Sequence, residues 1–393
     1  MTALGFFWKA AWAFVLGYAI SAMIQTFVPR GRLAPYLGDP DARSVSLATI
    51  FGAASSSCSF AALSAARALV LKGAHFVAAV AFMFASTNLV IELGILIVIF
   101  LGWEFLAAEL VGGLVLIVIS SLLIRLTYPE SWLDRARRRV EKMDPGEDDD
   151  FDWRERIRSR EGWYRVGHQF INEWKMVWEE ILIGFTIAGF MAVLVPPAVW
   201  EAIFLVDGHS DLPEWLVVLE NAMVAPFVAA ATFIGSMGNI PLATVLNTHG
   251  VLFAGIMAFI YSDLMVPPLV LINARYYGWR PALYIAGIMW VSIVLTALIV
   301  HYAFAALGVT PESRRVVEDV VHFSVDYTFY LNLAFAGLAG VLIWMNRRHL
   351  AHAEGGMDHD MAGDSKIKTF AARLAATILA LGLLLRLAMM ATS

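Results

Sequence analysis

Long apolar segments dominate this 393-residue sequence and leave few folds open to it. Hydrophobic residues make up 60% of the chain and charged residues 16%, whereas soluble domains are typically about 45–50% apolar and about 25% charged. A helix that crosses a bilayer needs about 20 mostly apolar residues. The sequence therefore predicts an all-α polytopic membrane protein with about ten membrane segments, near residues 4–27, 44–71, 74–100, 102–124, 177–199, 213–247, 250–273, 281–307, 325–345 and 369–390.

One long polar segment, residues 125–176, interrupts this pattern. It contains "RARRRVEK" and "DPGEDDDFDWRERIRSRE", and its Lys and Arg excess predicts a cytoplasmic location. Counting helices from it puts both termini inside and residues 346–368 outside, although that loop carries Arg347 and Arg348. If one late segment does not cross the membrane, the loop moves inside. The charged blocks could bind a partner, but a solvated linker explains them as well.

The two halves of the chain resemble each other. Three stretches of the first half, 14–29, 72–86 and 101–113, align in the same order with 181–196, 249–263 and 277–289. Four crossings in each half would return the chain to its starting side, which predicts two four-segment repeats of parallel topology. The expected organisation is a first transmembrane repeat (1–124), a charged cytoplasmic loop (125–176), a second repeat (177–307) and a C-terminal helix pair (308–393).

Each repeat contains one interrupted segment. "AASSSCSFAALSAA" in 44–71 occupies the same place as "AAATFIGSMGNIPLAT" in 213–247, and small polar residues, Gly or Pro break both. Non-helical backbone at membrane depth is tolerated only inside protein or facing a cavity. Paired interruptions at corresponding positions therefore predict two discontinuous helices, with a substrate pathway between them.

At these motifs the sequence resembles the bacterial permease family that includes the organoarsenical efflux permeases. Members pair a "PFCSC"-like motif with "GxxxxxALAFLLASPLVN", and the text here is "SSSCSFAALSAARALVLKGAHFVAAVAFMFASTNLVIELG". Cys58 falls on the first family cysteine, Phe60 stands in place of the second and Ser56 replaces the proline, a departure from a two-thiolate arsenic site. The resemblance covers roughly 14–305 and implies a permease that exports a small solute.

Five small polar residues at the first interruption are candidates for the pathway: Ser55, Ser56, Ser57, Cys58 and Ser59. A Cys58 thiolate could bind a soft metal or metalloid. Small residues also serve for close helix packing, which would explain the same cluster without a ligand.

Polar residues inside apolar segments give the remaining pathway candidates, which are Thr87, Asn88, Glu92, Asn239 and Asp263. Asn88 and Glu92 are four residues apart, which would put them on one helix face. An intramembrane acid suggests function by default, here proton coupling or neutralisation of a cation, whereas a structural interhelical hydrogen bond is the alternative. Glu92 and Asp263 are expected to face one cavity, and Glu104 and Glu109, nearer an interface, are interpreted as structural.

The segment "RRHLAHAEGGMDHDMAGDS" is expected to be a loop with soft metal ligands at His349, His352, Met357, His359 and Met361. A polar connector would produce the same pattern by chance.

Together these features predict a multi-pass permease of the bacterial cytoplasmic (inner) membrane that moves a small solute, such as a metal, metalloid or organometalloid, by ion coupling or facilitated flow. No nucleotide-binding or hydrolase motif is present, so neither an enzyme nor a cofactor is expected. The expected partners are the lipid bilayer and the solute, not nucleic acid, and a homo-oligomer stays open. The alternative function is a non-transporting membrane factor for metal handling or assembly.

Overall fold

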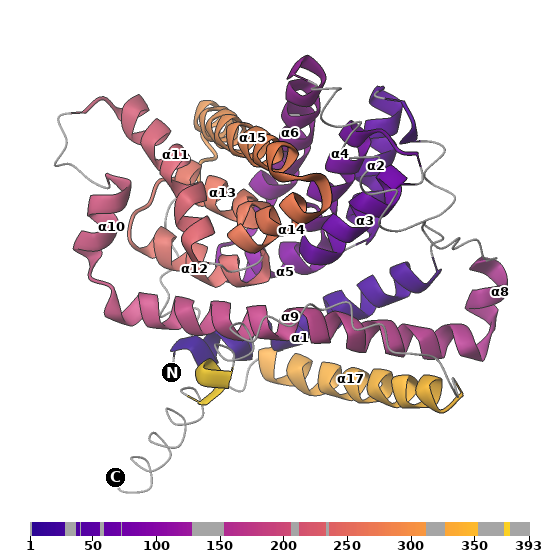
Figure 1. Cartoon of the computed structure of the whole chain (residues 1–393). Helices are drawn as coiled ribbons and strands as arrows, with labels where there is room; N and C mark the ends of the chain where they lie inside the picture. Colours follow the sequence, from indigo (N-terminus) through magenta and orange to yellow (C-terminus); the bar gives the residue numbers. More distant parts are fainter. Residues whose placement is uncertain are drawn as a thin grey trace, which may run out of the picture.

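The structure of the chain is a computed structural model that describes residues 2–27, 37–39, 41–55, 59–71, 73–127, 153–205, 212–232, 236–311, 327–352 and 373–377. Within these ranges the regular structure is helical throughout, as predicted (Figure 1). The apolar residues of each helix pack into one continuous core.

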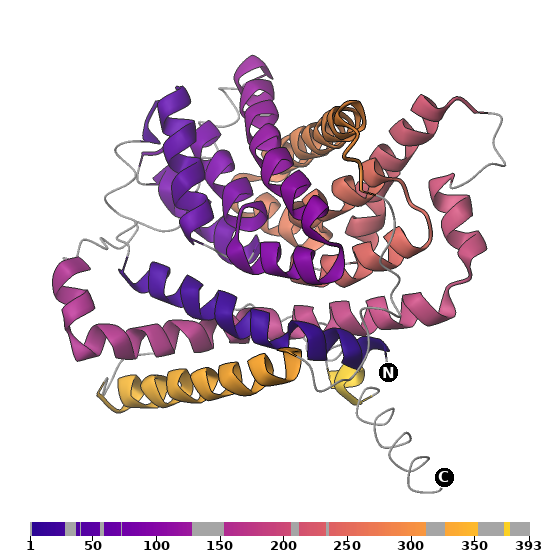
Figure 2. The same ribbon diagram turned by 180° about the vertical axis from the view of Figure 1, so that it is seen from behind.

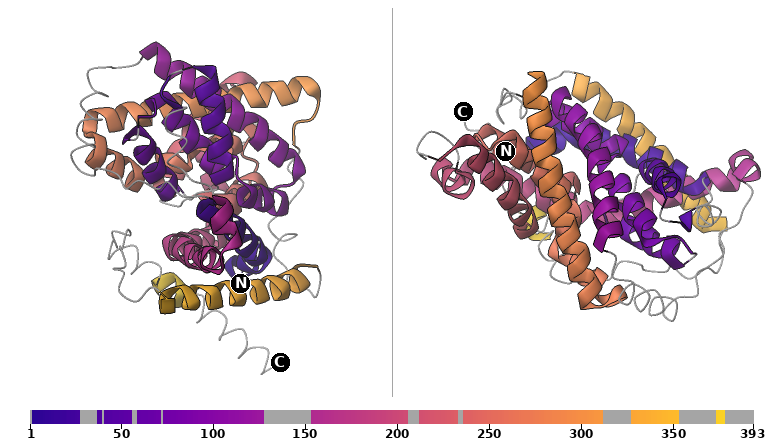
Figure 3. Two further views of the ribbon diagram at one scale, coloured as in Figure 1. Left: turned by 90° about the vertical axis from the view of Figure 1, so that its right-hand side faces the viewer. Right: turned by 90° about the horizontal axis from the view of Figure 1, so that it is seen from above.

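Three long helices form a layer along one side of the molecule: α1 (Thr2–Phe27), α9 (Arg160–Leu194) and α17 (Tyr327–His352) (Figures 1 and 3). The short helix α8 (Trp153–Arg158) precedes α9, and α10 (Pro197–Phe204) follows it. Pro196 and Pro197 end α9 and start α10, because proline cannot continue a helix but fits its first turn.

The remaining helices pack on this layer in two groups, one from each half of the chain (Figure 2). The first group is α2 (Ala42–Ser55), α3 (Ser59–Leu71), α4 (Phe76–Asn88), α5 (Ile91–Phe100) and α6 (Trp103–Thr127). The second is α11 (Glu214–Thr232), α12 (Ser236–Thr248), α13 (Phe253–Ile260), the 3₁₀-helix η3 (Tyr261–Met265), α14 (Pro267–Tyr277) and α15 (Trp279–Leu307).

Helix boundaries recur between the two groups. An offset of 177 residues separates the ends of α2 and α11, the starts and ends of α3 and α12, and the starts of α4 and α13. Both predicted interruptions therefore fall between separate helices, after Ser55 and after Thr232.

Helices at equivalent positions in the two halves run in opposite directions. In the α1–α9 pair, Phe6 contacts Phe185 (6.4 Å between ring centroids) while Phe27 contacts Trp163 (5.3 Å). In the α6–α15 pair, Gly112 lies beside Val300 and the Thr127 hydroxyl lies 2.8 Å from the Tyr284 hydroxyl. The prediction of a parallel relation is therefore wrong for these two pairs, because helices related by an axis along the membrane normal run the same way.

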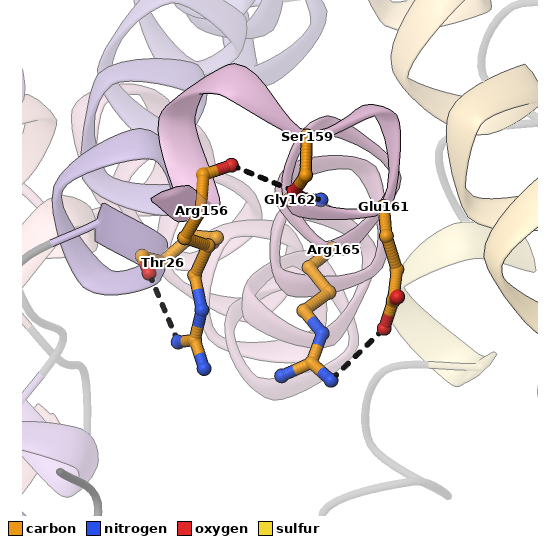
Figure 4. Close-up of polar contacts among 6 residues, drawn as sticks. All are labelled: Thr26, Arg156, Ser159, Glu161, Gly162 and Arg165. Carbon is orange, nitrogen blue, oxygen red and sulfur yellow. Dashed lines mark hydrogen bonds and ion pairs between the residues drawn. The ribbon is translucent and has the colours of Figure 1, made fainter. Parts of the chain in front are cut away.

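The start of α9 is fixed by polar contacts to α8 and α1 (Figure 4). The Ser159 hydroxyl caps α9 by accepting a hydrogen bond from the Gly162 N–H (3.0 Å) and donates one to the Arg156 carbonyl (2.9 Å). Arg156 in turn donates to the Thr26 carbonyl at the end of α1 (3.3 Å). The charged segment and the C-terminal end of α1 therefore meet at one end of the layer.

The C-terminal part of α17 reaches the same end. Tyr164 contacts Trp344, and Gly167 packs directly against the α17 backbone at Leu342 and Asn346. The start of α1 lies at the opposite end, where Ala3 packs on Gly189. The start of α1 therefore lies at the end of the layer away from the start of α9, and residues 346–352 lie at the same end as the start of α9. The rest of 346–368 lies outside the described residues.

Seven helices in the described ranges are long and apolar enough to cross a membrane, or eight if the bent pair α4–α5 counts as one span. This agrees with a polytopic membrane protein. The predicted segment 44–71 is divided into two short helices, α2 and α3, and most of the predicted segment 369–390 lies outside the described residues.

Candidate functional site

A hydrogen bond joins the first interruption to the second half of the chain. The Ser59 hydroxyl, at the start of α3, donates to Oδ2 of Asp263 in η3 (3.1 Å), and both residues are buried. Ser55 ends α2 and its hydroxyl donates back to the Gly52 carbonyl (2.9 Å). The structure thus brings together two of the predicted pathway residues, Ser59 and Asp263. Ser56, Ser57 and Cys58 lie outside the described residues.

Asp263 lies where regular α-helix gives way to a single 3₁₀ turn. Pro267 and Pro268 start α14 and cannot supply the N–H groups that would continue α13 as one helix. The 3₁₀ turn before them has poorer hydrogen-bond geometry than an α-helix and often marks a functional hinge.

Tyr261 connects this turn to α6. Its hydroxyl donates to the Ala108 carbonyl (3.0 Å), and its side chain is fully buried. Gly112 makes the contact possible, since a Cβ atom at this position would lie 1.8 Å from the Tyr261 hydroxyl oxygen. α6 and η3 therefore approach so closely because the face of α6 carries glycine here.

Glu109 is the functional candidate that sequence reasoning missed. It was interpreted as a structural residue near an interface, but it is 1% exposed and interacts electrostatically with Asp263 and Tyr261. Neither of its carboxylate oxygens has a hydrogen-bond partner among the described residues. Glu104, one turn earlier, is exposed. The available signal was spacing: Glu109 shares a helix face with Gly112 and Gly113, which indicates close packing around an acid.

Thr87 and Asn88 end α4 in the same region. The Thr87 hydroxyl donates to carbonyls of the preceding turn, and the Asn88 amide donates to the Phe84 carbonyl (3.1 Å) and to the Thr87 hydroxyl (3.2 Å). The Asn88 carbonyl oxygen is buried without a hydrogen-bond partner in the described part of the chain. Asn88 also faces α6, near Gly113. Its side chain therefore lies against the α6 face that carries Gly113.

Glu92 occupies a different environment from the one predicted. α4 ends at Asn88 and α5 begins at Ile91 with a bend of 42°, so Asn88 and Glu92 do not share a face of one helix. The extended backbone of Val90 causes the break. Glu92 is 1% exposed, and its Cβ lies against Gly17 of α1. Glu109 is an acid that interacts electrostatically with Asp263, and that Glu92 faces the same cavity stays a prediction.

Asn239 lies in the first turns of α12, the helix after the second interruption. The side chain is fully buried, and neither atom of its amide group has a hydrogen-bond partner within the described ranges. α12 packs on η3, α5, α9 and α13. Buried amides are normally bonded, so a group left open in this way has spare capacity for a ligand.

The predicted metal-binding loop begins as helix. His349 and His352 belong to the last turn of α17, and Met357, His359 and Met361 lie outside the described residues. The His349 ring packs on His168 (4.8 Å between centroids), whose nitrogens lie 3.0 Å from the side chains of Asn346 and Asn172. Among described residues no group of three or more His, Cys, Asp or Glu side chains could hold a metal ion.

Buried carboxylate and hydroxyl groups thus meet in the interior of a helical membrane protein, with further buried amides on α4 and α12. Polar and ionisable groups are costly at this depth and typically mark substrate or ion pathways. The fold and this site define the class: a multi-pass helical membrane protein with a buried polar centre formed by both halves of the chain.

Comparison with known proteins gives the family. Residues 2–302 match the model of a family described as "Predicted permease", and the chain belongs to this family, which confirms the resemblance seen in the sequence. A Mycobacterium tuberculosis (strain ATCC 25618 / H37Rv) protein named "Putative permease Rv2963" is 37% identical over 327 residues, which cover 80% of this chain and 79% of that protein. The Escherichia coli (strain K12) "UPF0718 protein YraQ" is 30% identical over 118 residues, 30% of this chain and 33% of that protein. No solved structure matches the chain significantly.

Proposed function

We propose that this membrane permease moves a small solute, in the class of metals, metalloids or organometalloids, through the region where α3, η3 and α6 meet. The observation that carries the proposal is the buried hydrogen bond between Ser59 and Asp263, because it links the interruption of one half to the acid of the other. Membership of the permease family supports transport as the activity.

The two halves are best explained as inverted repeats. Recurring helix boundaries support a repeat, and the opposite directions of α1 and α9, and of α6 and α15, support a two-fold axis in the membrane plane. Inverted repeats place the substrate site at the repeat interface, and rocking of one repeat against the other exposes it to alternate sides.

The orientation follows from the basic residues. Twelve of the 28 Lys and Arg residues lie in 125–176, and Arg347 and Arg348 reach the same end of the molecule. Cytoplasmic loops carry this excess, so we place that end in the cytoplasm of a bacterial cell and the start of α1 outside its cytoplasmic membrane. The direction of transport that fits the family resemblance is export.

The test is flux through the purified chain in proteoliposomes, with arsenite, a trivalent methylarsenical, Cu⁺ and Zn²⁺ as probes. We expect the wild type to move at least one probe, and Asp263→Asn to slow it at least about fivefold, the lower end of typical coupling effects between sites. Glu161→Gln is the control, since Glu161 is exposed on α9 and pairs only with Arg165 in the described structure. Flux equal to the wild type in the Asp263→Asn variant would contradict a pathway through the region where α3, η3 and α6 meet.

Two further variants test the predicted Cys58 thiolate ligand and the alternative function. Cys58→Ser slows flux of the thiol-reactive probes alone if the thiolate binds the solute. Deletion of residues 355–363 leaves flux intact if the protein is a permease of this kind. Loss of function after this deletion, with the α3–η3 site unchanged, would favour the non-transporting metal-handling factor.

A further inference from the structure

We propose that Glu109 and Asp263 form a proton-binding site, in which Glu109 holds a proton while Asp263 is ionised. A role of this proton in driving transport rests on the proposed function. The binding of the proton at this site does not depend on the proposed function. The site was not expected from the sequence, which marked Asp263 and Glu92 as a pair.

Burial carries the first step. Glu109 and Asp263 are each 1% exposed, and they interact electrostatically across the contact between α6 and η3. Two carboxylates that interact in a buried, low-dielectric interior cannot both stay charged at acceptable cost, so neutralisation of one by a proton is the simplest solution. A metal ion is the other solution; the described residues contain no group of three or more His, Cys, Asp or Glu side chains that could hold one, and elemental analysis separates the two solutions.

Hydrogen bonding decides which acid holds the proton. Asp263 accepts the Ser59 hydroxyl hydrogen at Oδ2, and an acceptor bond of this kind favours the ionised form. Glu109 has no hydrogen-bond donor on either oxygen in the described structure, so nothing there stabilises its charge. Tyr261 donates its own hydrogen to the Ala108 carbonyl and not to Glu109.

Other titratable groups do not remove this asymmetry. The elements that pack on α6 and η3 carry few of them: Glu92 on α5, Glu214 and Glu220 on α11, Arg275 on α14, Arg280 and His301 on α15, and Arg67 on α3 beyond Ser59. No salt bridge joins any of these cations to Glu109 in the described ranges. Because no cation among the described residues pairs with this carboxylate, we assign its neutralisation to a proton.

Access to the site requires a change of conformation. Because both acids are buried, a proton enters or leaves only when α6 and η3 separate. The 3₁₀ turn before Pro267 has poorer hydrogen-bond geometry than an α-helix, so we place the hinge for this separation there, beside the close contact between Tyr261 and Gly112. Proton exchange and opening are then linked, which is the property that a proton-coupled permease needs.

Infrared spectroscopy of the reconstituted protein tests the site without any transported solute. At pH 7 the wild type should show the C=O band of a protonated carboxyl group that exchanges slowly in D₂O, and Glu109→Gln should remove this band. Asp263→Asn should keep the band at a shifted frequency. Glu104→Gln, which changes an exposed acid on the same helix, is the matched control and should leave it unchanged.

A Glu109→Gln difference spectrum with only carboxylate bands would overturn the proposal, because Glu109 would then be ionised in the wild type. One tightly bound metal ion per chain, lost in both variants by elemental analysis, would overturn it as well. If the band behaves as expected but the wild type moves none of the probes, the proton site stands and the proposed transport function fails. If flux is observed without the band, transport stands and the proton site fails.

Discussion

Two buried acids of this protein have opposite surroundings. Between α1 and α9, Oε1 of Glu173 accepts hydrogen bonds from the Ser21 hydroxyl (2.9 Å) and from the Gln25 amide, and Gln169 extends the network to Gln25 (2.9 Å). Between α6 and η3, Glu109 is equally buried but has no hydrogen-bond partner in the described structure. The first acid is integrated into helix packing, and the second is not.

The difference separates structural from functional polarity inside a membrane protein. An acid whose carboxylate accepts hydrogen bonds from both helices, as Oε1 of Glu173 does, lowers the cost of its own burial and fixes the register of the two helices that it joins. An unbonded acid contributes nothing of this kind, and it persists only if another requirement keeps it. Burial alone therefore does not identify a functional acid, whereas burial without partners is informative.

The sharpest test compares Glu173→Ala with Glu109→Ala. Both substitutions remove the same atoms, but only the first breaks hydrogen bonds, those that the Ser21 hydroxyl and the Gln25 amide donate to Glu173. We expect Glu173→Ala to lower the free energy of unfolding by roughly 2–4 kcal/mol more than Glu109→Ala does. Equilibrium unfolding in mixed micelles measures this, and equal losses in the two variants would erase the distinction.

A second test concerns a third buried acid, Glu92 of α5, whose Cβ packs against Gly17 of α1. A Cβ atom at Gly17 would lie 2.2 Å from Cβ and 3.2 Å from Cα of Glu92, so Gly17→Ala forces α1 and α5 apart. We expect a loss of about 1–3 kcal/mol in stability. Gly337→Ala on α17 is the control because no atom lies within 4 Å of its added Cβ, and helix propensity predicts a gain of up to about 1 kcal/mol. The same equilibrium unfolding assay in mixed micelles measures both variants, and a Gly17→Ala variant as stable as the wild type would contradict the contact.

Tyr261→Phe tests the connection between η3 and α6. The variant loses one neutral hydrogen bond to the Ala108 carbonyl, which predicts a destabilisation of about 1 kcal/mol. The infrared band assigned to Glu109 should persist, since the Tyr261 hydroxyl does not donate to that carboxyl group. Loss of the band in this variant would show that Tyr261 helps to hold the proton.

The smallest expected effect comes from an exposed acid, Asp41, which caps the start of α2. Its Oδ1 accepts the Ser44 N–H (2.7 Å), and this bond lowers the pKa of Asp41 below its usual value of 3.8. A lowered pKa in the folded state gives stability that is present above the unfolded value and is lost as pH falls through the folded value. Below pH 3.8 the helical signal of the wild type should fall slightly and that of Asp41→Ala should not, as circular dichroism would show. The same loss of helical signal at low pH in the wild type and in Asp41→Ala would exclude a capping role for Asp41.

The sequence predicted the parts of the site that small polar residues and prolines mark. The interruptions after Ser55 and Thr232 were visible because serine and glycine stand where an apolar helix would continue. Asp263 was visible as an acid in an apolar segment followed by two prolines. Ser59 and Asp263 were both predicted to line one pathway, but the hydrogen bond between them was not predicted.

Other features leave no local signal. The break between α4 and α5 occurs at Leu89 and Val90, where neither Gly nor Pro is present. At the 177-residue offset the second half has Val266 and Pro267, so only one copy of this break is marked in the sequence. Glu109 was missed because its partners come from η3, more than 150 residues away. The opposite directions of α1 and α9, and of α6 and α15, were also hidden in the sequence, because counting segments assumed that every apolar stretch crosses the membrane.

The antiparallel pairing of α1 with α9 and of α6 with α15 has a consequence for how the chain could be produced. Each half supplies one helix to each pair, so the main contacts between the halves are made by folded helices. Residues 128–152 join the halves in sequence and lie outside the described residues. Two polypeptides cut within this stretch would each carry one helix of both described pairs, and co-expressing them as separate fragments should reassemble one protein.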